Sequence, residues 1–454
     1  MLKRLFLFSV VASAGFAQFT QIPFAPRVTA DDFILIRPAE PEPPPKLRPL
    51  LTPATYKIEW DIDMSPYAGG EDLLFAMRVL EKLETYLLAK SPLAYSKDMY
   101  ARTWRLTELF MIWLPVNYFT MVAQHEIFGH GYRIRDIGPR TGKVRGYSFG
   151  TPPPYGDGGG ATSYSFNDRL TTTQETAISM GGVEATALLA WTTKLKWLES
   201  GRIDPRQSVL YLLSEHDLNL YIGSLKAAKD QDLTGHDINS YIHSLNYTYP
   251  DNILSKGRLR SLSWINLADV FTFYAIYSWF HYLSSGKESK IPMIASCYLP
   301  GLRLGLTPFG PEVFFENFFV RKQQPVYAYV KGGHHAKNNY FGAGIYAPRL
   351  YGAGKWEFGI RFDLWRQPKL LLQPGALLIT DIDFDIAPSV DNPLYPYSQR
   401  HAMRFGAAGS AIAFFRGTEK CGFEAELGYK AKGFLPGYSL KAIPVARLAF
   451  TLLF

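Results

Sequence analysis

Hydrophobic and polar residues change their spacing twice along the chain. Over residues 55–64 they alternate, which is typical of a β-strand with one apolar face. Over residues 65–290 most apolar residues recur at a helical spacing, and over residues 291–454 the alternation returns. The pattern therefore predicts an α+β protein in which a helical domain is inserted between a first strand and a longer series of strands.

The inserted domain contains several amphipathic segments. The predicted helices cover residues 71–90, 97–135, 171–197, 205–224, 236–245 and 264–284. One stretch, from Leu109 to Ala123, is almost free of charge. A membrane-spanning helix needs about 20 apolar residues, so we expect this shorter stretch to be a buried core helix. Residues 138–170 are rich in Gly and Pro, and their aromatic triplets, Tyr147–Phe149 and Tyr164–Phe166, predict a β-hairpin with a long tip.

The C-terminal alternation predicts strands of an unusual polarity. Apolar residues occupy one face, and charged residues of both signs or Gly occupy the other, so the charges could pair. Strands of about ten residues with this pattern are typical of a transmembrane barrel with a polar lumen. The last strand ends at Phe454 and resembles the C-terminal signature of bacterial outer-membrane proteins. We expect an antiparallel barrel of about 8–10 strands that begins with residues 55–64; the alternative is a soluble antiparallel β-sandwich.

The N-terminus predicts export from the cytoplasm. Lys3 and Arg4 precede an apolar run that ends in small residues, so residues 1–17 are predicted to be a secretory signal peptide. Residues 18–54 are rich in Pro and predict a stiff extended segment. We therefore expect the protein in the outer membrane of the cell, with a periplasmic or secreted location as the alternative.

Composition excludes one class of partner. The net charge is +8, but the basic residues are scattered, so we do not expect nucleic-acid binding. Cys297 and Cys421 lack metal-ligand spacing, and the sequence leaves open whether they pair. The expected partners are outer-membrane lipid and a peptide substrate.

Candidate chemistry is concentrated in residues 124–131, which read QHEIFGHG. In the zinc-binding HExxH motif the two histidines are four residues apart and lie on one side of a helix, with the Glu beside them as general base. Here His125 and His130 are five apart, about 140° on a regular helix. They can share a metal only if a π-bulge absorbs the extra residue or if Gly129 ends the helix early. A second arrangement needs no distortion, because Glu126 and His130 are four apart and lie on one face.

Without Ile127 the string would read HEFGHG, which resembles the motif of zincin peptidases, notably the membrane-embedded site-2 type. A zinc site needs a third protein ligand. Glu184 is the best candidate, because it lies on an apolar helix face where Gly181 and Ala185 permit a close approach. The alternative is that Glu184 pairs with a buried Arg or Tyr. His216-Asp217 and His236-Asp237 are weaker candidates for a supporting His/carboxylate pair.

The resemblance implies a zinc peptidase. Gluzincin-type zincins complete their site with a Glu from a later helix, so His125, His130 and Glu184 would hold zinc and Glu126 would act as general base. Our first hypothesis is a secreted, outer-membrane-associated zinc hydrolase. The second is a non-enzymatic outer-membrane barrel, such as a porin, adhesin or assembly factor, with a helical plug or docking domain. The third is an outer-membrane lipid hydrolase.

Overall fold

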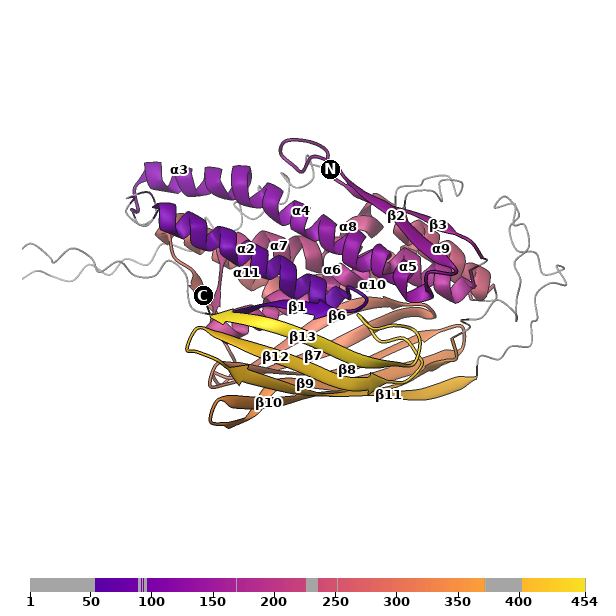
Figure 1. Ribbon diagram of the computed structural model, residues 1–454. Helices are drawn as coiled ribbons and strands as arrows, with labels where there is room; N and C mark the ends of the chain where they lie inside the picture. Colours follow the sequence, from indigo (N-terminus) through magenta and orange to yellow (C-terminus); the bar gives the residue numbers. More distant parts are fainter. Residues whose placement is uncertain are drawn as a thin grey trace, which may run out of the picture. The chain divides into compact units, whose positions relative to one another are not determined.

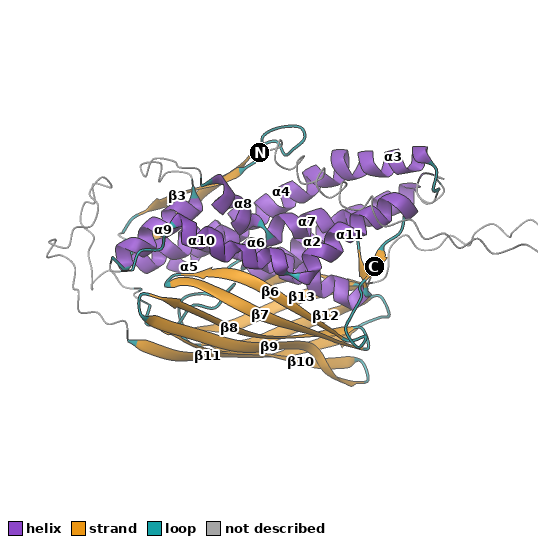
Figure 2. Ribbon diagram, turned by 180° about the vertical axis from the view of Figure 1, so that it is seen from behind, coloured by secondary structure: helices purple, strands orange, loops and turns teal. Residues whose placement is uncertain are grey.

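The computed structural model describes most of the chain after the Pro-rich segment. The described residues are 54–88, 91, 93, 96–168, 170–225, 236–250, 252–370, 372 and 402–453. The predicted signal peptide, residues 1–17, lies outside them, as do residues 18–53 of the Pro-rich segment. A layer of helices lies on one face of a large sheet (Figures 1 and 2). All described residues belong to one compact unit.

Nine antiparallel strands form the large sheet, in the order β1-β13-β12-β11-β10-β9-β8-β7-β6. The strands are β1 (Thr55–Asp61), β6 (Tyr298–Thr307), β7 (Gly310–Arg321), β8 (Gln324–His335), β9 (Asn338–Ala353), β10 (Trp356–Pro368), β11 (Met403–Arg416), β12 (Cys421–Lys430) and β13 (Ile443–Leu453). The prediction that residues 55–64 contain the first strand of this sheet is confirmed, because β1 pairs with β13 and places Ile58 opposite Phe450.

The predicted closed barrel is wrong, because the described strands form an open sheet with β1 and β6 at its edges. Helix α6 (Thr172–Ser200) packs on the face that a barrel would enclose, against β1, β6 and β8. A helix at this position keeps the two edge strands apart. The alternative β-sandwich is also wrong, because the other two sheets in the described chain have only two strands each.

The helical layer follows the sequence pattern closely. Its elements are α2 (Pro66–Leu88), α3 (Met99–Glu108), η2 (Leu109–Trp113), α4 (Leu114–His125), η3 (Glu126–His130), α5 (Gly131–Ile137), α7 (Pro205–Glu215), α8 (Asp217–Ser224), α9 (Asp237–Thr248), α10 (Lys256–Ser263), η4 (Trp264–Ala268) and α11 (Val270–Ser285). The segments α3 to α5 form a continuous helix, Met99–Ile137, interrupted only by the π-helical turns η2 and η3. The sequence pattern does not predict α10.

One local expectation needs correction, one open question is answered and one expectation is confirmed. Phe110, Met111 and Ile112 are 42–48% exposed, so the stretch from Leu109 to Ala123 is not a fully buried core helix. Cys297 and the other cysteine are free thiols and do not pair. The predicted hairpin is present as β2 (Gly142–Phe149) and β3 (Gly160–Phe166). A short pair, β4 (Arg202–Ile203) and β5 (Ser289–Lys290), completes the described elements.

Charged residues of the large sheet point towards the helices and pair there. Lys57 lies 2.7 Å from Glu424, and Arg447 lies 2.9 Å from Glu426. Lys194 of α6 is fully buried and meets three carboxylates, those of Glu215, Asp269 and Glu316. The expectation that charges on this face of the strands would pair is therefore confirmed.

Candidate metal site

The two histidines of the motif meet because the turn between them is π-helical. The N–H of Gly131 donates to the carbonyl of Glu126, five residues earlier, which is the hydrogen bond of a π-helix. This wider turn brings the Nε2 atoms of His125 and His130 to 3.1 Å from each other. The predicted π-bulge is thus confirmed. The helix does not break at Gly129, because α5 continues to Ile137.

Asp237, in the first turn of α9, provides a third donor atom. Its Oδ2 lies 3.0 Å from Nε2 of His125 and 3.1 Å from Nε2 of His130. Ligand atoms around a tetrahedral zinc ion with bonds of about 2.0–2.1 Å lie about 3.3 Å from one another. The three atoms therefore need to move only slightly to surround one ion. Among the described residues, these three form the group of His, Cys, Asp or Glu with ligand spacing.

The far nitrogen of each imidazole is also fixed. Nδ1 of His130 donates to the carbonyl of Ile178 at 2.7 Å, and a carbonyl only accepts, so Nε2 of His130 keeps a lone pair when the ring is neutral. Nδ1 of His125 lies 2.9 Å from the carboxylate of Asp217. Asp217 in turn accepts a hydrogen bond of 2.9 Å from Thr186. Metal-ligating histidines have this same arrangement, with the second nitrogen held by a carboxylate or a carbonyl.

Glycines let α6 approach the motif helix closely enough to support it. A Cβ atom on Gly129 would lie 2.7 Å from the carbonyl oxygen of Gly181. A Cβ atom on Gly182 would lie 2.1 Å from Nε2 of His125. The close approach that the sequence predicted at Gly181 is therefore present. Gly182 extends this contact, because it lies against the imidazole of His125.

Electrostatics favour positive charge at the centre of the cluster. Burial alone would raise the pKa of the Asp237 carboxyl, but His130 and His125 outweigh it and hold that pKa well below its usual range. Tyr221 stacks on the ring of His125, with its hydroxyl 3.2 Å from Nε2. Burial raises the pKa of Tyr221, and the charges of Asp237, Asp217 and Glu126 raise it further, so this phenol stays neutral.

Glu126 lies beside the cluster and is held by the hairpin. Its Oε2 accepts a 2.7 Å hydrogen bond from the hydroxyl of Thr162 in β3. Its side chain also lies against the backbone of Gly160, where an added Cβ atom would be 2.8 Å from its Cγ. Glu126 is buried. The undistorted alternative, with Glu126 and His130 as the ligand pair, is not the arrangement found, because Glu126 is hydrogen-bonded to Thr162.

Glu184 is not part of this cluster, which corrects the predicted ligand set. Two nitrogens of Arg133 donate hydrogen bonds to the carboxylate of Glu184, Nε at 2.9 Å and Nη2. The backbone N–H of Gly437 donates to it at 2.7 Å. The physical reason is that a buried carboxylate needs a cation, and Arg133 supplies one from the same helix that carries the histidines. The alternative of a buried Arg partner is the correct one.

The sequence indicated Asp237 only as a weaker candidate, for a supporting role and not as a ligand. It appeared as half of the pair His236-Asp237 at a predicted helix start. His236 caps α9 by accepting from the N–H of Asn239, and the adjacent Asp237 contacts the histidines from the first turn of this helix. Asp217, from the other weak pair, holds His125. The only sequence signal for both was an Asp that directly follows a His.

Comparison with known proteins adds no assignment, because the chain matches no family model, no curated protein and no solved structure.

Proposed function

We propose that the protein is a metal-dependent hydrolase in which His125, His130 and Asp237 hold a divalent ion. The observation that carries the proposal is the convergence of three donor atoms at 3.0–3.1 Å from one another, with both imidazoles held from behind. Two imidazoles and one carboxylate are a ligand set that suits zinc and leaves a fourth position for water or substrate.

We assign the role of general base to Glu126, which follows His125 in the chain and is buried. A bound zinc ion would polarise a substrate carbonyl and lower the pKa of water at the site to about 7. Glu126 would take the proton of that water, and Thr162 would orient its carboxylate through the 2.7 Å hydrogen bond. The neutral hydroxyl of Tyr221, beside His125, can donate to the oxygen on which negative charge develops.

The hairpin supports a peptide as substrate. In the described chain β3 pairs only with β2, so the other edge of β3 has free backbone groups. Gly160 and Thr162 place this strand against Glu126. An extended peptide could add to such an edge by backbone hydrogen bonds, which would bring a peptide bond to the general base.

The test separates metal binding from catalysis. We expect about one zinc per chain in the purified full-length protein, and hydrolysis of a casein-like substrate. Glu126→Gln should keep the metal and lower kcat by about 10²–10⁴-fold. Glu419→Gln, at an exposed position between β11 and β12, is the matched control and should leave both unchanged. Undiminished hydrolysis by Glu126→Gln with zinc bound would show that Glu126 is not the base.

Two other outcomes point to the other hypotheses. Less than one zinc per several chains would favour the non-enzymatic outer-membrane protein. Activity on lipid esters, with none on casein, would favour the lipid hydrolase.

A further inference from the structure

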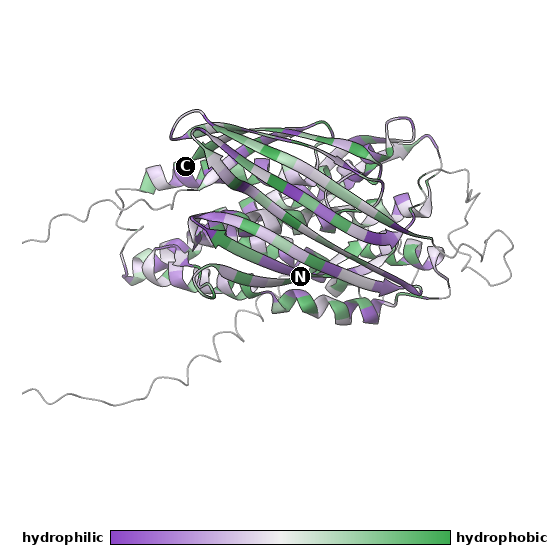
Figure 3. Ribbon diagram, turned by 90° about the horizontal axis from the view of Figure 1, so that it is seen from below, coloured by the Kyte–Doolittle hydropathy of each residue, from purple (hydrophilic) through white to green (hydrophobic). Residues whose placement is uncertain are grey.

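The outer face of the large sheet has the polarity of a protein surface in lipid. On β10 the outward residues Trp356, Phe358, Ile360, Phe362 and Leu364 are 42–49% exposed. Between them, Arg361 and Asp363 are buried and Glu357 is half-buried. Strands β7, β8, β9, β11, β12 and β13 repeat this pattern with Phe315, Phe319, Val330, Phe341, Ile345, Phe405, Phe423, Leu427 and Leu448. On the edge strand β6 the outward residues Tyr298 and Leu302, opposite Phe319 and Phe315, are half-buried. Figure 3 shows this face of the sheet, with many hydrophobic residues along the strands.

Three helical segments repeat the same polarity. Their exposed large apolar residues are Val79, Leu80, Leu83, Tyr86 and Leu87 on α2, Phe110, Met111 and Ile112 on η2, and Phe273, Ile276, Tyr277 and Phe280 on α11. Within residues 75–88, 109–113 and 270–284, none of the exposed residues is charged. A helix at the surface of a water-soluble protein shows the opposite arrangement, with its charged residues outward.

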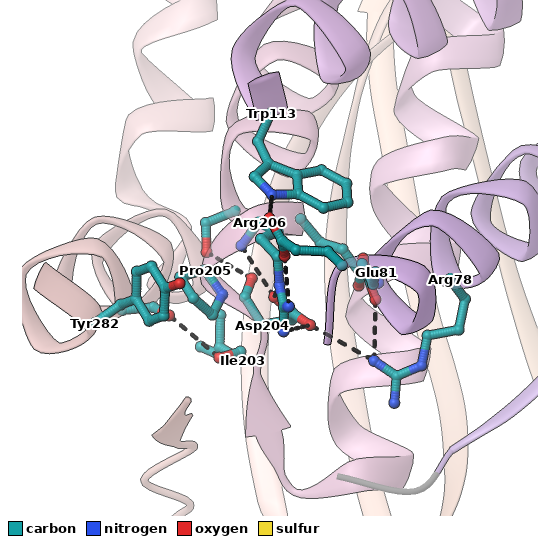
Figure 4. A network of polar contacts seen from close by, with 12 residues as sticks. Arg78, Glu81, Trp113, Ile203, Asp204, Pro205, Arg206 and Tyr282 are labelled. Atoms are coloured by element: carbon teal, nitrogen blue, oxygen red, sulfur yellow. Dashed lines mark hydrogen bonds and ion pairs between the residues drawn. The ribbon is translucent and has the colours of Figure 1, made fainter. Parts of the chain in front are cut away.

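Most charges of these helices lie on their inner sides, where they form a buried network (Figure 4). Lys82 of α2 is the exception, because it is partly exposed. Arg78 of α2 lies 3.0 Å from Glu81 and 3.5 Å from Asp204. Glu84 of α2 meets Arg206 of α7 at 3.0 Å. Glu84 also accepts a hydrogen bond from the indole of Trp113 in η2, and Tyr282 of α11 donates to Glu108 in α3. The network joins the helices from inside and leaves their outer sides apolar.

These helices lie at the open edges of the sheet. Helix α2 packs beside the edge strand β1, where the N–H of Glu59 donates to Asp72 at 2.7 Å. Helix α11 packs beside the other edge strand, β6, and α3 packs beside α11. The apolar surface therefore continues from the sheet, across both edges, onto the helices.

We infer that the nine strands, α2, η2 and α11 form one lipid-facing wall, and that this wall is embedded in the hydrocarbon of a bilayer. A single protein partner would cover one face, whereas this apolar surface extends over the sheet and over the helices at both of its edges. Buried backbone edges must be satisfied or covered in lipid, and the helices cover the edges that the open sheet leaves. By length and composition alone the helix Met99–Ile137 could also cross a membrane, although half of its most apolar window is buried in the protein.

The metal site lies on the same continuous helix as part of the wall. Trp113, the last residue of η2, precedes His125 by 12 residues, which is about 18 Å along a helix. The inference goes beyond the proposed hydrolase, because it uses none of the metal ligands.

Contact with lipid can be measured at single positions of the full chain. Cys297→Ser and Cys421→Ser remove the native thiols, and one new cysteine is then introduced per protein. Leu83→Cys, Phe110→Cys and Phe280→Cys report on the helices, and Phe358→Cys reports on the sheet. Ser261→Cys, exposed on α10, is the control. Each thiol carries a fluorophore, and the protein is reconstituted in phosphatidylcholine/phosphatidylglycerol vesicles with or without lipid that bears a quenching spin label on its acyl chain.

We expect the labels at residues 83, 110, 280 and 358 to lose most of their fluorescence to the quencher, and the label at residue 261 to keep it. Quenching at residue 358 alone would overturn the shared wall, because the helices would then lie outside the lipid. No quenching at any position would overturn embedding altogether. Leu87→Cys and Phe273→Cys repeat the helix measurement if a first variant fails to fold. Zinc content is recorded for every sample, so that loss of the metal site is distinguished from loss of lipid contact.

Discussion

His125 and His130 face each other with their Nε2 atoms 3.1 Å apart, although five residues separate them in the chain. On a regular α-helix their side chains would point about 140° apart. The π-helical turn η3 removes this difference, because its hydrogen bond spans one residue more than an α-helical one. The extra residue, compared with the HExxH motif, thus changes the spacing of the two histidines in sequence and preserves their proximity in space.

Deletion of Ile127 should convert η3 into a regular α-helical turn and keep the metal site. The deletion restores the HExxH spacing, so both imidazoles stay on one side of the helix. We expect zinc affinity within about tenfold of the parent protein, equivalent to about 1.4 kcal/mol. Competition with a chromophoric chelator measures it.

Deletion of Ala123 is the matched control for this experiment. Ala123 lies in the regular helix α4, so its removal rotates the motif by about 100° relative to the helix before it. We expect this deletion to abolish zinc binding. Loss of zinc binding from the Ile127 deletion as well would show that the π-turn is needed for more than the spacing of the histidines.

The sequence predicted those features that depend on local spacing. Alternation identified β1 and the C-terminal strands, and the position of the two histidines required a bulge that η3 provides. Alternation also showed which face of each strand is apolar. Closure of a sheet is different, because it depends on what packs inside the curve. Here α6 fills that space, and no pattern within the strands records it.

The third ligand could not be predicted because it comes from a distant segment. Asp237 lies 107 residues after His130, and only the tertiary fold brings it close. Glu184 was correctly expected to point into the core, but a buried carboxylate can meet either a metal ion or an Arg. Here Arg133 is the partner of Glu184. Arg133 follows the π-helical turn η3 on the motif helix, so the side of the helix on which it lies depends on that turn.

Replacement of the two competing carboxylates should have opposite effects. Asp237→Ala removes a donor atom, so we expect zinc affinity to fall by more than the 10–100-fold that is typical of supporting residues around a metal. Glu184→Gln removes the carboxylate that accepts hydrogen bonds from two nitrogens of Arg133, while Asp136 remains 3.7 Å from that guanidinium. We therefore expect a loss of stability of about 3 kcal/mol, the lower end for a broken buried pair. The variant should nevertheless keep zinc.

Zinc titration and denaturant unfolding of both variants check this pair of expectations. Normal zinc affinity in Asp237→Ala together with loss of zinc in folded Glu184→Gln would restore Glu184 as the ligand.

Gly182→Ala should disturb the metal site without touching a ligand. The new Cβ atom would lie 2.1 Å from Nε2 of His125, so either the imidazole or α6 must move. We expect zinc affinity to fall at least about tenfold. Gly223→Ala in α8 is the control, because nothing lies within 4 Å of the added Cβ atom. It should bind zinc normally and gain about 0.5–1 kcal/mol of stability from a better helix former. Equal zinc affinity in both variants would mean that Gly182 does not position His125.

His216 should make the protein less stable in acid, independently of any metal. Burial, and then the charge of Lys194, lowers the pKa of His216 to about 4, whereas an unfolded histidine has a pKa of about 6.5. Between these two pKa values His216 binds a proton in the unfolded chain and stays neutral in the folded protein. Stability is therefore lost as pH falls below about 6.5, and the loss, about 3 kcal/mol, is complete below about 4.

The variant His216→Gln isolates this effect, because glutamine can still bond to the hydroxyl of Thr272, which lies 3.1 Å from Nε2 of His216. We expect the parent to lose about 3 kcal/mol more stability than the variant between pH 7 and pH 4, measured by denaturant unfolding in detergent with chelator present. His334→Gln, at an exposed position near the end of β8, is the control and should follow the parent. Parallel curves for the parent and His216→Gln would mean that His216 is protonated in the folded protein and that its burial has no stability cost in this range.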